Sequence, residues 1–221
     1  CRENGDGVIP ILDDICKPED VKRIMNETLD NFDSLDVLIN NAAVAPHTSL
    51  LDETPELWDR VYSINCRGTF MMTQAAARLM IEKGDGGRII NFSSGVSRRG
   101  SPGTAAYASS RAAVEAFTRV AAIELSPHTI LVNVVSPGLI DTQPKPLPNE
   151  MKKSLEKRIP QLPLSRPGYP QEVVELVLFL SSEASSYING EVISIDGGSG
   201  IGSRPKDPVI DEDPRYFWLR K

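Results

Sequence analysis

Short apolar runs alternate with longer amphipathic stretches along this chain of 221 residues. The runs are rich in Val and Ile and contain few alternating polar positions, which is typical of strands that helices cover on both faces. The stretches between the runs have the length and apolar spacing of helices. The pattern predicts a parallel sheet with strands over Val8–Leu12, Val37–Asn40, Gly87–Ser93, Ile130–Ser136 and Val192–Asp196.

Helices are predicted between these strands. Lys17-Pro18-Glu19-Asp20 places a proline and two acidic residues in an opening turn, which is a frequent helix start. After Asp141 the chain is rich in proline as far as Pro170, so we expect an excursion there with a short helix near Glu150–Arg158. The longer predicted helices are Pro18–Asn31, Pro55–Lys83, Ala105–Leu125 and Pro170–Ser181.

Composition and charge narrow the function classes. With 40% hydrophobic and 24% charged residues, the chain suits one globular α/β domain over residues 1–202, followed by a tail over 203–221. The net charge of -6 argues against a nucleic-acid partner, which usually needs a basic face. No apolar run reaches the ~20 residues of a membrane span. The three cysteines lack paired or metal-binding spacing, so we expect a cytoplasmic protein with neither membrane contact nor metal.

A serine and a tyrosine form the candidate catalytic pair. Ser94 closes a predicted strand, at the carboxyl edge where open α/β sheets bind ligands. Tyr107 opens a predicted helix, and Arg111 follows one turn later on the same helix face. A cation there favours tyrosinate, which transfers protons while a serine hydroxyl orients the reacting oxygen. Taken alone, such a serine and tyrosine are more often a helix cap and a packing residue.

Six motifs in order resemble those of the short-chain dehydrogenase/reductase family. They are LINNAA (Leu38–Ala43), INCRG (Ile64–Gly68), GRIINFSS (Gly87–Ser94), YASSR (Tyr107–Arg111), SPGLIDT (Ser136–Thr142) and SIDGG (Ser194–Gly198). The resemblance is closest to the branch that includes 3-oxoacyl-carrier-protein reductases. It implies a Rossmann-type, doubly wound parallel sheet. It also implies an NAD(P)-dependent oxidoreductase that interconverts a small-molecule alcohol and carbonyl, as a homodimer or homotetramer.

The resemblance also assigns site residues. Asn65 would hold a water in a proton relay, Ser94 would position the substrate carbonyl, and Tyr107 would transfer the proton with support from Arg111. Asp13 is as good an acid as Asp14 at the adenine end, so that assignment stays open. The residues implied to bind NAD or NADP are Asp14, Ile15, Asn41, Ala42, Tyr107, Arg111, Pro137, Gly138, Ile140 and Thr142.

Two departures from the family pattern bear on activity. Arg111 replaces the signature lysine, and an arginine supplies charge but hardly gives up a proton, so we expect weakened catalysis unless an acid such as Glu115 accommodates it. The family's opening strand and T-G-x-x-x-G-x-G loop, which binds the pyrophosphate, have no counterpart in Cys1–Gly7. We therefore expect an N-terminally truncated fragment of a dehydrogenase, with a catalytically inactive scaffold as the alternative.

Overall fold

The computed structural model describes residues 7–142 and 149–204. Within these residues, one sheet has the strand order β1-β2-β3-β4, and all neighbouring strands are parallel. The tail predicted over 203–221 lies, beyond Arg204, outside the described residues. The strands are β1 (Val37–Asn40), β2 (Gly87–Phe92), β3 (Ile130–Pro137) and β4 (Val192–Ile195), which confirms the parallel α/β fold.

The helices follow the predicted pattern closely. Three of them, α1 (Pro18–Asn31), α5 (Ala105–Leu125) and α7 (Pro170–Ser181), have the predicted bounds. The short helix of the proline-rich excursion is α6 (Asn149–Arg158), and one further short helix that the pattern did not predict is α4 (Val96–Arg99). Single 3-10 turns lie at Ser126–His128, Ile159–Gln161 and Glu183–Ser185. No helix in the described ranges is long and apolar enough to cross a bilayer.

The helix predicted over Pro55–Lys83 forms, but its middle is wound differently. It comprises α2 (Pro55–Tyr62), a π-helical stretch over Ser63–Gly68 and α3 (Thr69–Lys83). A Cβ at Gly68 would lie 2.7 Å from Cδ1 of Ile15, so the glycine allows the chain before α1 to pack closely. π-Helical turns are rare and occur frequently at functional sites.

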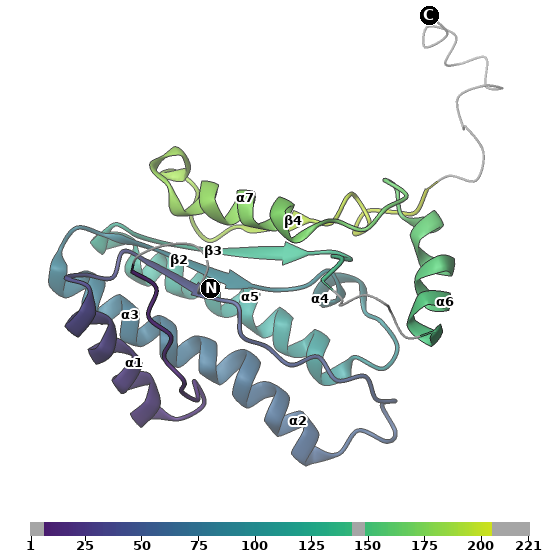
Figure 1. Cartoon of the computed structure of the whole chain (residues 1–221), viewed down its shortest axis with the longest axis horizontal. Coiled ribbons are helices and arrows are strands. Elements are labelled where there is room, and N and C mark those ends of the chain that lie inside the picture. The colour runs from purple at the N-terminus through teal and green to yellow at the C-terminus, as the bar shows by residue number, and fades with distance from the viewer. Residues whose placement is uncertain (1–6, 143–148, 205–221) are drawn as a thin grey trace, which may run out of the picture.

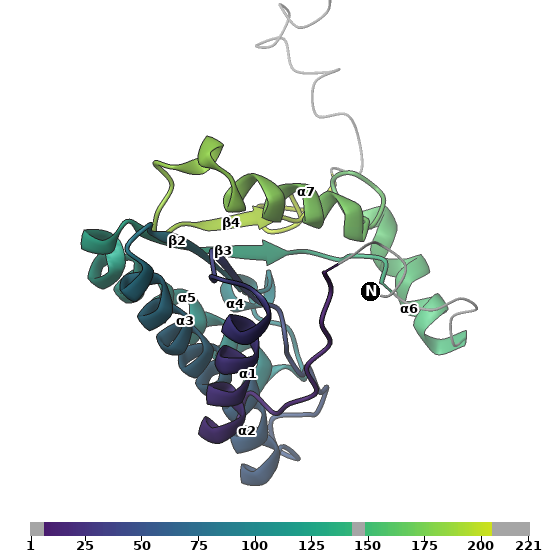
Figure 2. The same cartoon turned by 60° about the vertical axis from the view of Figure 1, so that its left-hand side comes forward.

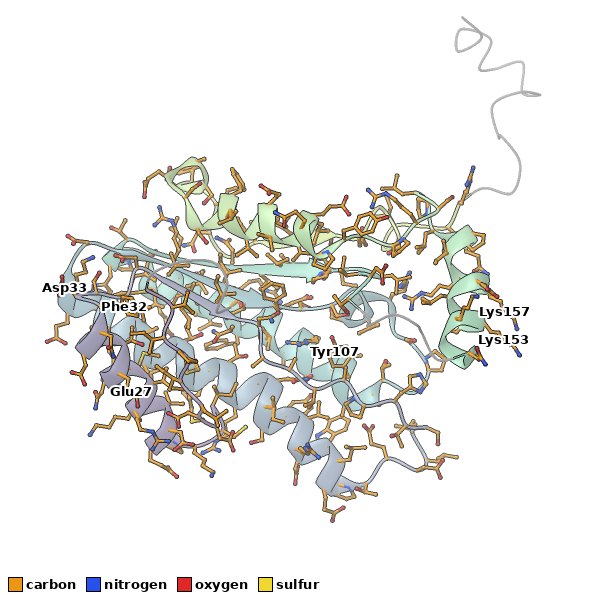
Figure 3. The ribbon with its side chains drawn as sticks, viewed as in Figure 1. Glu27, Phe32, Asp33, Tyr107, Lys153 and Lys157 are labelled. Carbon is orange, nitrogen blue, oxygen red and sulfur yellow. The ribbon has the colours of Figure 1, made fainter. Side chains whose placement is uncertain are left out.

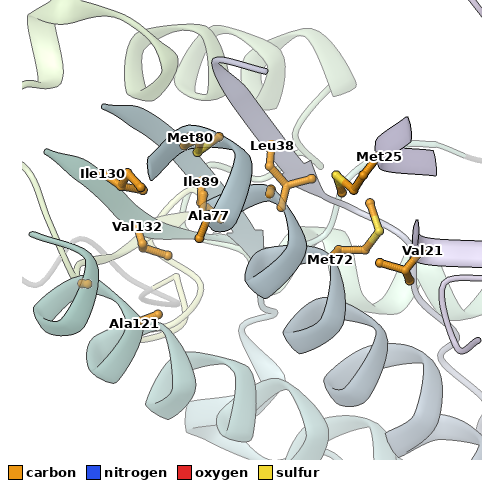
Figure 4. Close-up of a cluster of buried hydrophobic side chains, with 12 residues drawn as sticks. Val21, Met25, Leu38, Met72, Ala77, Met80, Ile89, Ala121, Ile130 and Val132 are labelled. Atoms are coloured by element: carbon orange, nitrogen blue, oxygen red, sulfur yellow. The ribbon is translucent and has the colours of Figure 1, made fainter. Parts of the chain in front are cut away.

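Helices cover both faces of the sheet, as Figure 1 shows: α7 lies over one face, and α1, α3 and α5 lie over the other. Each face has its own apolar core. The core under α7 consists of Ile90, Val135, Val177 and Leu180. The larger core, part of which appears in Figure 4, consists of Val21, Met25, Leu38, Met72, Ala76, Ala77, Met80, Ile89, Ala121, Ala122, Ile130 and Val132.

The last crossover connection differs from the two before it. The connections β1–β2 and β2–β3 pass through α3 and α5 on one face, whereas β3–β4 passes through α7 on the opposite face. The sheet nevertheless advances in the same direction at each step. The face on which the connecting helix lies and the direction in which the sheet advances together set the hand of a crossover. The connection through α7 therefore has the opposite hand from the first two, although the crossovers of a parallel sheet usually share one hand.

The prediction of a strand over Val8–Leu12 is wrong. This segment is not paired with any described strand and, in Figure 2, runs as a coil into α1 without an arrow. Val8 and Ile9 are exposed and Leu12 is fully exposed, although their apolar pattern suits a covered strand. A strand forms only where a neighbouring strand satisfies its backbone groups. The described strand β1 has β2 as its partner, and none of the described strands lies beside Val8–Leu12.

A chain of buried polar side chains ties β1 and β2 to the helices below them. Asn40 Nδ2 donates to Thr73 Oγ1 at 3.0 Å and to Asn91 Oδ1 at 2.8 Å. Asn91 Nδ2 donates in turn to Thr118 Oγ1 at 2.8 Å. All four residues are buried, so each depends on its neighbours for hydrogen bonds that water would otherwise supply.

We predict that Asn91→Ala lowers the free energy of unfolding by about 2–4 kcal/mol, because it leaves buried groups of Asn40 and Thr118 without a partner. Urea denaturation of the purified protein measures this change. Asn26→Ala on the exposed side of α1 is the control and should leave the midpoint nearly unchanged. Equal midpoints for the two variants would contradict the prediction.

The first turn of α7 is fixed by a bidentate ion pair. Arg166 Nη1 and Nη2 donate to the two carboxylate oxygens of Glu172 at 2.9 and 2.7 Å, and Oε2 of Glu172 also accepts from the Tyr169 backbone N–H at 2.7 Å. The hydrogen bonds from Arg166, followed by that from Tyr169, lower the pKa of Glu172 to about 2. Ile140 pairs with Gly168 just before this turn, so the ion pair also steadies the loop that follows β3.

The lowered pKa of Glu172 predicts a pH dependence of stability. Because the unfolded carboxylate takes up its proton near 4.5 and the folded one near about 2, the ion pair stabilises the fold fully above the first pH and loses its contribution on the way down to the second. Between about pH 6 and about pH 3, Glu172→Gln should therefore lose less stability than the unaltered protein in urea denaturation. Glu175→Gln, on the exposed side of the same helix, should behave like the unaltered protein.

Candidate functional site

The candidate site lies at the carboxyl edge of the sheet. Asn41 follows β1, Ser94 follows β2, and Pro137 ends β3, so the parallel strands bring these predicted site residues to one edge. The backbone on both sides of Ser94 is bonded to β3. The Ser93 N–H donates to the Val135 carbonyl at 2.8 Å, and the Gly95 N–H donates to the Pro137 carbonyl at 3.2 Å. Ser94 is half-buried between these two bonds.

Tyr107 and Arg111 lie together on the first turns of α5. Figure 3 shows Tyr107 on the α5 face of the sheet, below the arrowheads of the strands. The Arg111 guanidinium carbon lies 5.3 Å from the centroid of the Tyr107 ring, which is a cation–π distance. Arg111 is only 3% exposed, and its Nη1 donates to the Phe92 carbonyl at 2.9 Å. The guanidinium is thus held over the ring face and against the end of β2.

Asn65 is fully buried in the π-helical stretch, where protein atoms bond its side chain. Its Oδ1 accepts from the Val44 N–H at 2.9 Å, and its Nδ2 donates to the Val44 carbonyl and to Ser110 Oγ, each at 3.0 Å. Ser110 Oγ in turn donates to the Tyr107 carbonyl at 2.8 Å. Asn65 therefore reaches the turn of Tyr107 through Ser110, a residue that the sequence reasoning did not single out.

Glu115 contacts the segment that carries Ser94. Its Oε1 accepts hydrogen bonds from Ser93 Oγ at 2.5 Å and Ser97 Oγ at 2.6 Å, and Glu115 is 8% exposed. From the sequence, Glu115 was a candidate acid to interact with Arg111. In the described structure the two side chains instead face different partners, since Arg111 donates to Phe92 and Glu115 accepts from the serines. Nothing in the sequence pattern distinguishes Ser93, Ser97 or Glu115 from ordinary core and loop residues.

The two acids proposed for the adenine end differ in accessibility. Asp13 forms an ion pair with Arg23, and its side chain is only 4% exposed. Asp14 is exposed, and its Oδ1 accepts from the Cys16 N–H at 2.9 Å, a bond that lowers the pKa of Asp14. Ile15 packs against the larger apolar core. Of the two acids, Asp14 is therefore the one whose carboxylate is open to a ligand.

The remaining predicted cofactor residues surround the carboxyl ends of β1 and β3. Asn41 and Ala42 are exposed. At Gly138 a Cβ would lie 2.6 Å from Cβ of Asp196, so this turn after β3 requires glycine. Thr142 is exposed, and Ile140 lines a cavity of about 330 Å³. Other residues that line this cavity are Leu139, Leu164, Arg166, Glu172, Ser194 and Asp196.

The predicted cofactor residues gather at the strand ends, but the described residues offer no counterpart of a pyrophosphate site. Asn41 and Ala42 after β1 are exposed, and the turn after β3 passes close to Asp196 at Gly138. Among the described residues, however, no strand leads through a glycine-rich turn into a helix of eight or more residues, which is the usual cradle for a pyrophosphate. In the same ranges no cluster of His, Cys, Asp and Glu has the make-up of a metal site.

Comparison with known proteins places this geometry in a family. Residues 2–200 match a family model described as enoyl-(acyl carrier protein) reductase. The chain is 37% identical over 192 residues to a 3-oxoacyl-(acyl-carrier-protein) reductase of Thermotoga maritima, covering 86% of this chain and 76% of that protein. It is 37% identical over 190 residues to the NAD-dependent glycerol dehydrogenase of Listeria innocua, covering 85% of this chain and 73% of that protein.

Solved structures agree. A short-chain type dehydrogenase/reductase from Mycobacterium marinum superposes with a TM-score of 0.79 at 36% identity, over 86% of this chain and 74% of that one. A second structure, from Sinorhizobium meliloti, superposes with a TM-score of 0.81 at 30% identity, over 87% and 76% of the two chains. The carboxyl-edge site, the parallel sheet and these matches lead to one conclusion: the chain belongs to the short-chain dehydrogenase/reductase family.

Proposed function

We propose that this protein is an NAD(P)-dependent oxidoreductase that interconverts an alcohol and a carbonyl at Ser94 and Tyr107. The observation that carries this proposal is the bonding of α5 to both neighbouring parts of the site. Ser110 joins the turn of Tyr107 to Asn65, and Arg111 joins the same helix to the end of β2. Such bonding fixes the first turns of α5, which carry the proposed proton donor, and general acid–base catalysis requires a donor that is held in place.

The chemistry follows from the two hydroxyl groups. When bound, the nicotinamide would supply the hydride for reduction and accept it for oxidation. Tyr107 would give its phenolic proton to the carbonyl oxygen during reduction and take a proton back during oxidation, while the Ser94 hydroxyl would donate a hydrogen bond to that oxygen. Arg111 would keep the Tyr107 ring in place through the cation–π contact.

The residues at the strand ends would hold the cofactor. Asn41 and Ala42 would line its channel, and the segment from Pro137 to Thr142 would lie against the nicotinamide end. Support comes from the exposure of the first pair and from the glycine turn at Gly138. The exposed carboxylate of Asp14 would border the adenine, beside Ile15. In this proposal the cofactor is either NAD or NADP.

A second copy of the chain would cover the outer surfaces of α3 and α5. Phe70, Ile81, Val120 and Ile123 are exposed there, and a cavity of about 330 Å³ runs between the two helices. We place a homodimer or homotetramer contact on this apolar surface. The free thiols of Cys16 and Cys66 suit the reducing cytoplasm.

The alternative is a scaffold of the same family without catalysis. The observation that favours it is the position of Arg111, which is buried against Phe92. An arginine guanidinium stays protonated and therefore does not exchange protons as a lysine ammonium can. The intact set of Asn65, Ser94 and Tyr107 at one edge favours the enzyme.

Substitution of the proton donor tests the enzyme. In the native protein, Tyr107→Phe should reduce turnover of carbonyl substrates by about 10²- to 10⁴-fold, because the phenolic proton is lost. Ser94→Ala should also reduce it strongly. Oxidation of NADH or NADPH with a panel of aldehydes and ketones is the measurement. The control is Tyr187→Phe at a fully exposed position. A Tyr107→Phe protein that keeps most of its turnover would rule out the assigned mechanism.

Substitution of the arginine decides between an impaired and an adapted site. We predict that Arg111→Lys raises turnover severalfold, because a compact ammonium keeps the charge near Tyr107 and can exchange a proton with water. Steady-state turnover across pH, with each nucleotide saturating, measures the effect, and thermal unfolding is followed separately because the bond to Phe92 changes. Arg119→Lys, exposed on the same helix, is the control. Equal or lower turnover for Arg111→Lys would show that Arg111 is adapted to this site.

A further inference from the structure

Four residues form one stripe along α5, and three of them bond to β2 or to the segment after it. Tyr107, Arg111, Glu115 and Thr118 are spaced by three or four positions and therefore share a helix face. Thr118 accepts from Asn91, Glu115 accepts from Ser93, and Arg111 donates to the Phe92 carbonyl. The stripe thus contacts the carboxyl end of β2 and the residue after it, and Tyr107 lies one helical turn before Arg111.

Glu115 is the member of this stripe that bonds the serines before and after Ser94. Its Oε1 accepts from Ser97 Oγ at 2.6 Å, and Ser97 Oγ also lies 2.8 Å from the Ser94 carbonyl oxygen. Ser93, on the other side, bonds to the same carboxylate oxygen at 2.5 Å. One carboxylate oxygen therefore bonds Ser93 and Ser97, the two serines before and after Ser94.

Glu115 is a buried acidic residue on a helix face where an apolar side chain would be usual. A carboxylate that is 8% exposed pays a large desolvation penalty, and no cation among the described residues forms an ion pair with it. The compensation comes from two short hydrogen bonds, in the distance range of hydroxyl donors to a carboxylate. An apolar residue here would pack against β2 without that penalty. What the acid adds is a fixed path for the turn from Ser93 to Ser97.

We infer that Glu115 is a positioning residue for Ser94: its carboxylate fixes the Ser93–Ser97 turn and so sets the place of the Ser94 hydroxyl relative to Tyr107 on the same helix. The inference rests on the proposed function, because the consequence of that placement is turnover. Its structural part, the hold of Glu115 on the turn, is independent of any activity. The two parts can therefore be measured separately.

The experiment compares Glu115→Leu with Glu115→Gln in the native protein. Glu115→Leu should lower kcat on the order of 100-fold, because a small displacement of a reacting group has an effect of that size, and should leave KM for the nucleotide unchanged. Glu115→Gln retains a carbonyl oxygen as acceptor and should restore most of kcat. Amide hydrogen exchange should be faster over residues 93–100 in Glu115→Leu than in the unaltered protein, with residues 37–40 unchanged. Glu82→Leu, exposed on α3, is the control for both readouts.

The possible results separate the two proposals. If the unaltered protein shows no turnover on any carbonyl, the proposed function fails, and amide hydrogen exchange alone tests the positioning role. Faster exchange over residues 93–100 in Glu115→Leu would then support that role. Unchanged exchange would overturn it. If Glu115→Leu does not fold, Ser97→Ala replaces it and should show the same local increase in exchange with a lowered kcat. An equal loss of kcat in Glu115→Gln and Glu115→Leu would overturn the inference, since it would mean that charge matters and not the bonds to the serines.

Discussion

The contact of α5 with β2 is the constraint on which the rest of this structure depends. A helix usually packs on a sheet through apolar side chains, and α5 does so through Ala121 and Ala122. Towards its N-terminus the contact becomes polar, with bonds from Thr118 to Asn91 and from Arg111 to Phe92. Polar contacts have strict geometric requirements, whereas apolar ones tolerate small shifts. The contacts of α5 therefore change along the helix, from apolar packing that tolerates small shifts to hydrogen bonds that fix side-chain positions at the carboxyl edge.

The same contact explains how an arginine is retained beside Tyr107. A guanidinium that is 3% exposed must find acceptors, and the Phe92 carbonyl at the end of β2 supplies one at 2.9 Å. The Tyr107 ring supplies a second favourable surface. Arg111 thus ties the start of α5 to the end of β2 and to the Tyr107 ring. The signature lysine has a compact ammonium instead of a planar guanidinium.

The N-terminal part of the described chain illustrates two kinds of apolar pattern. Ile15 enters the core because Gly68 leaves space for its side chain, and the Asp14–Cys16 turn directs it there. Val8, Ile9 and Leu12 have a similar composition but remain exposed, because none of the described strands lies beside them. Apolar character alone does not bury a segment. A covered surface or a strand partner must be present to receive it.

Local signals in the sequence were sufficient for most elements of this fold. Proline at the first helical position and acidic residues in the first turn marked α1, and runs rich in Ile and Val marked β2 and β3, because these preferences act within a few residues of chain. The motifs around Asn65, Ser94 and Tyr107 also identified the family before any contact was known. Only the tertiary structure decided that Ser110 links Asn65 to Tyr107, that Glu115 bonds the serines instead of Arg111, and that Val8–Leu12 is not a strand. The partners of Asn65 and Glu115 come from distant parts of the chain, and Val8–Leu12 has no partner among the described strands. The hydrogen-bonding capacity of a side chain or a backbone does not reveal which partner will satisfy it.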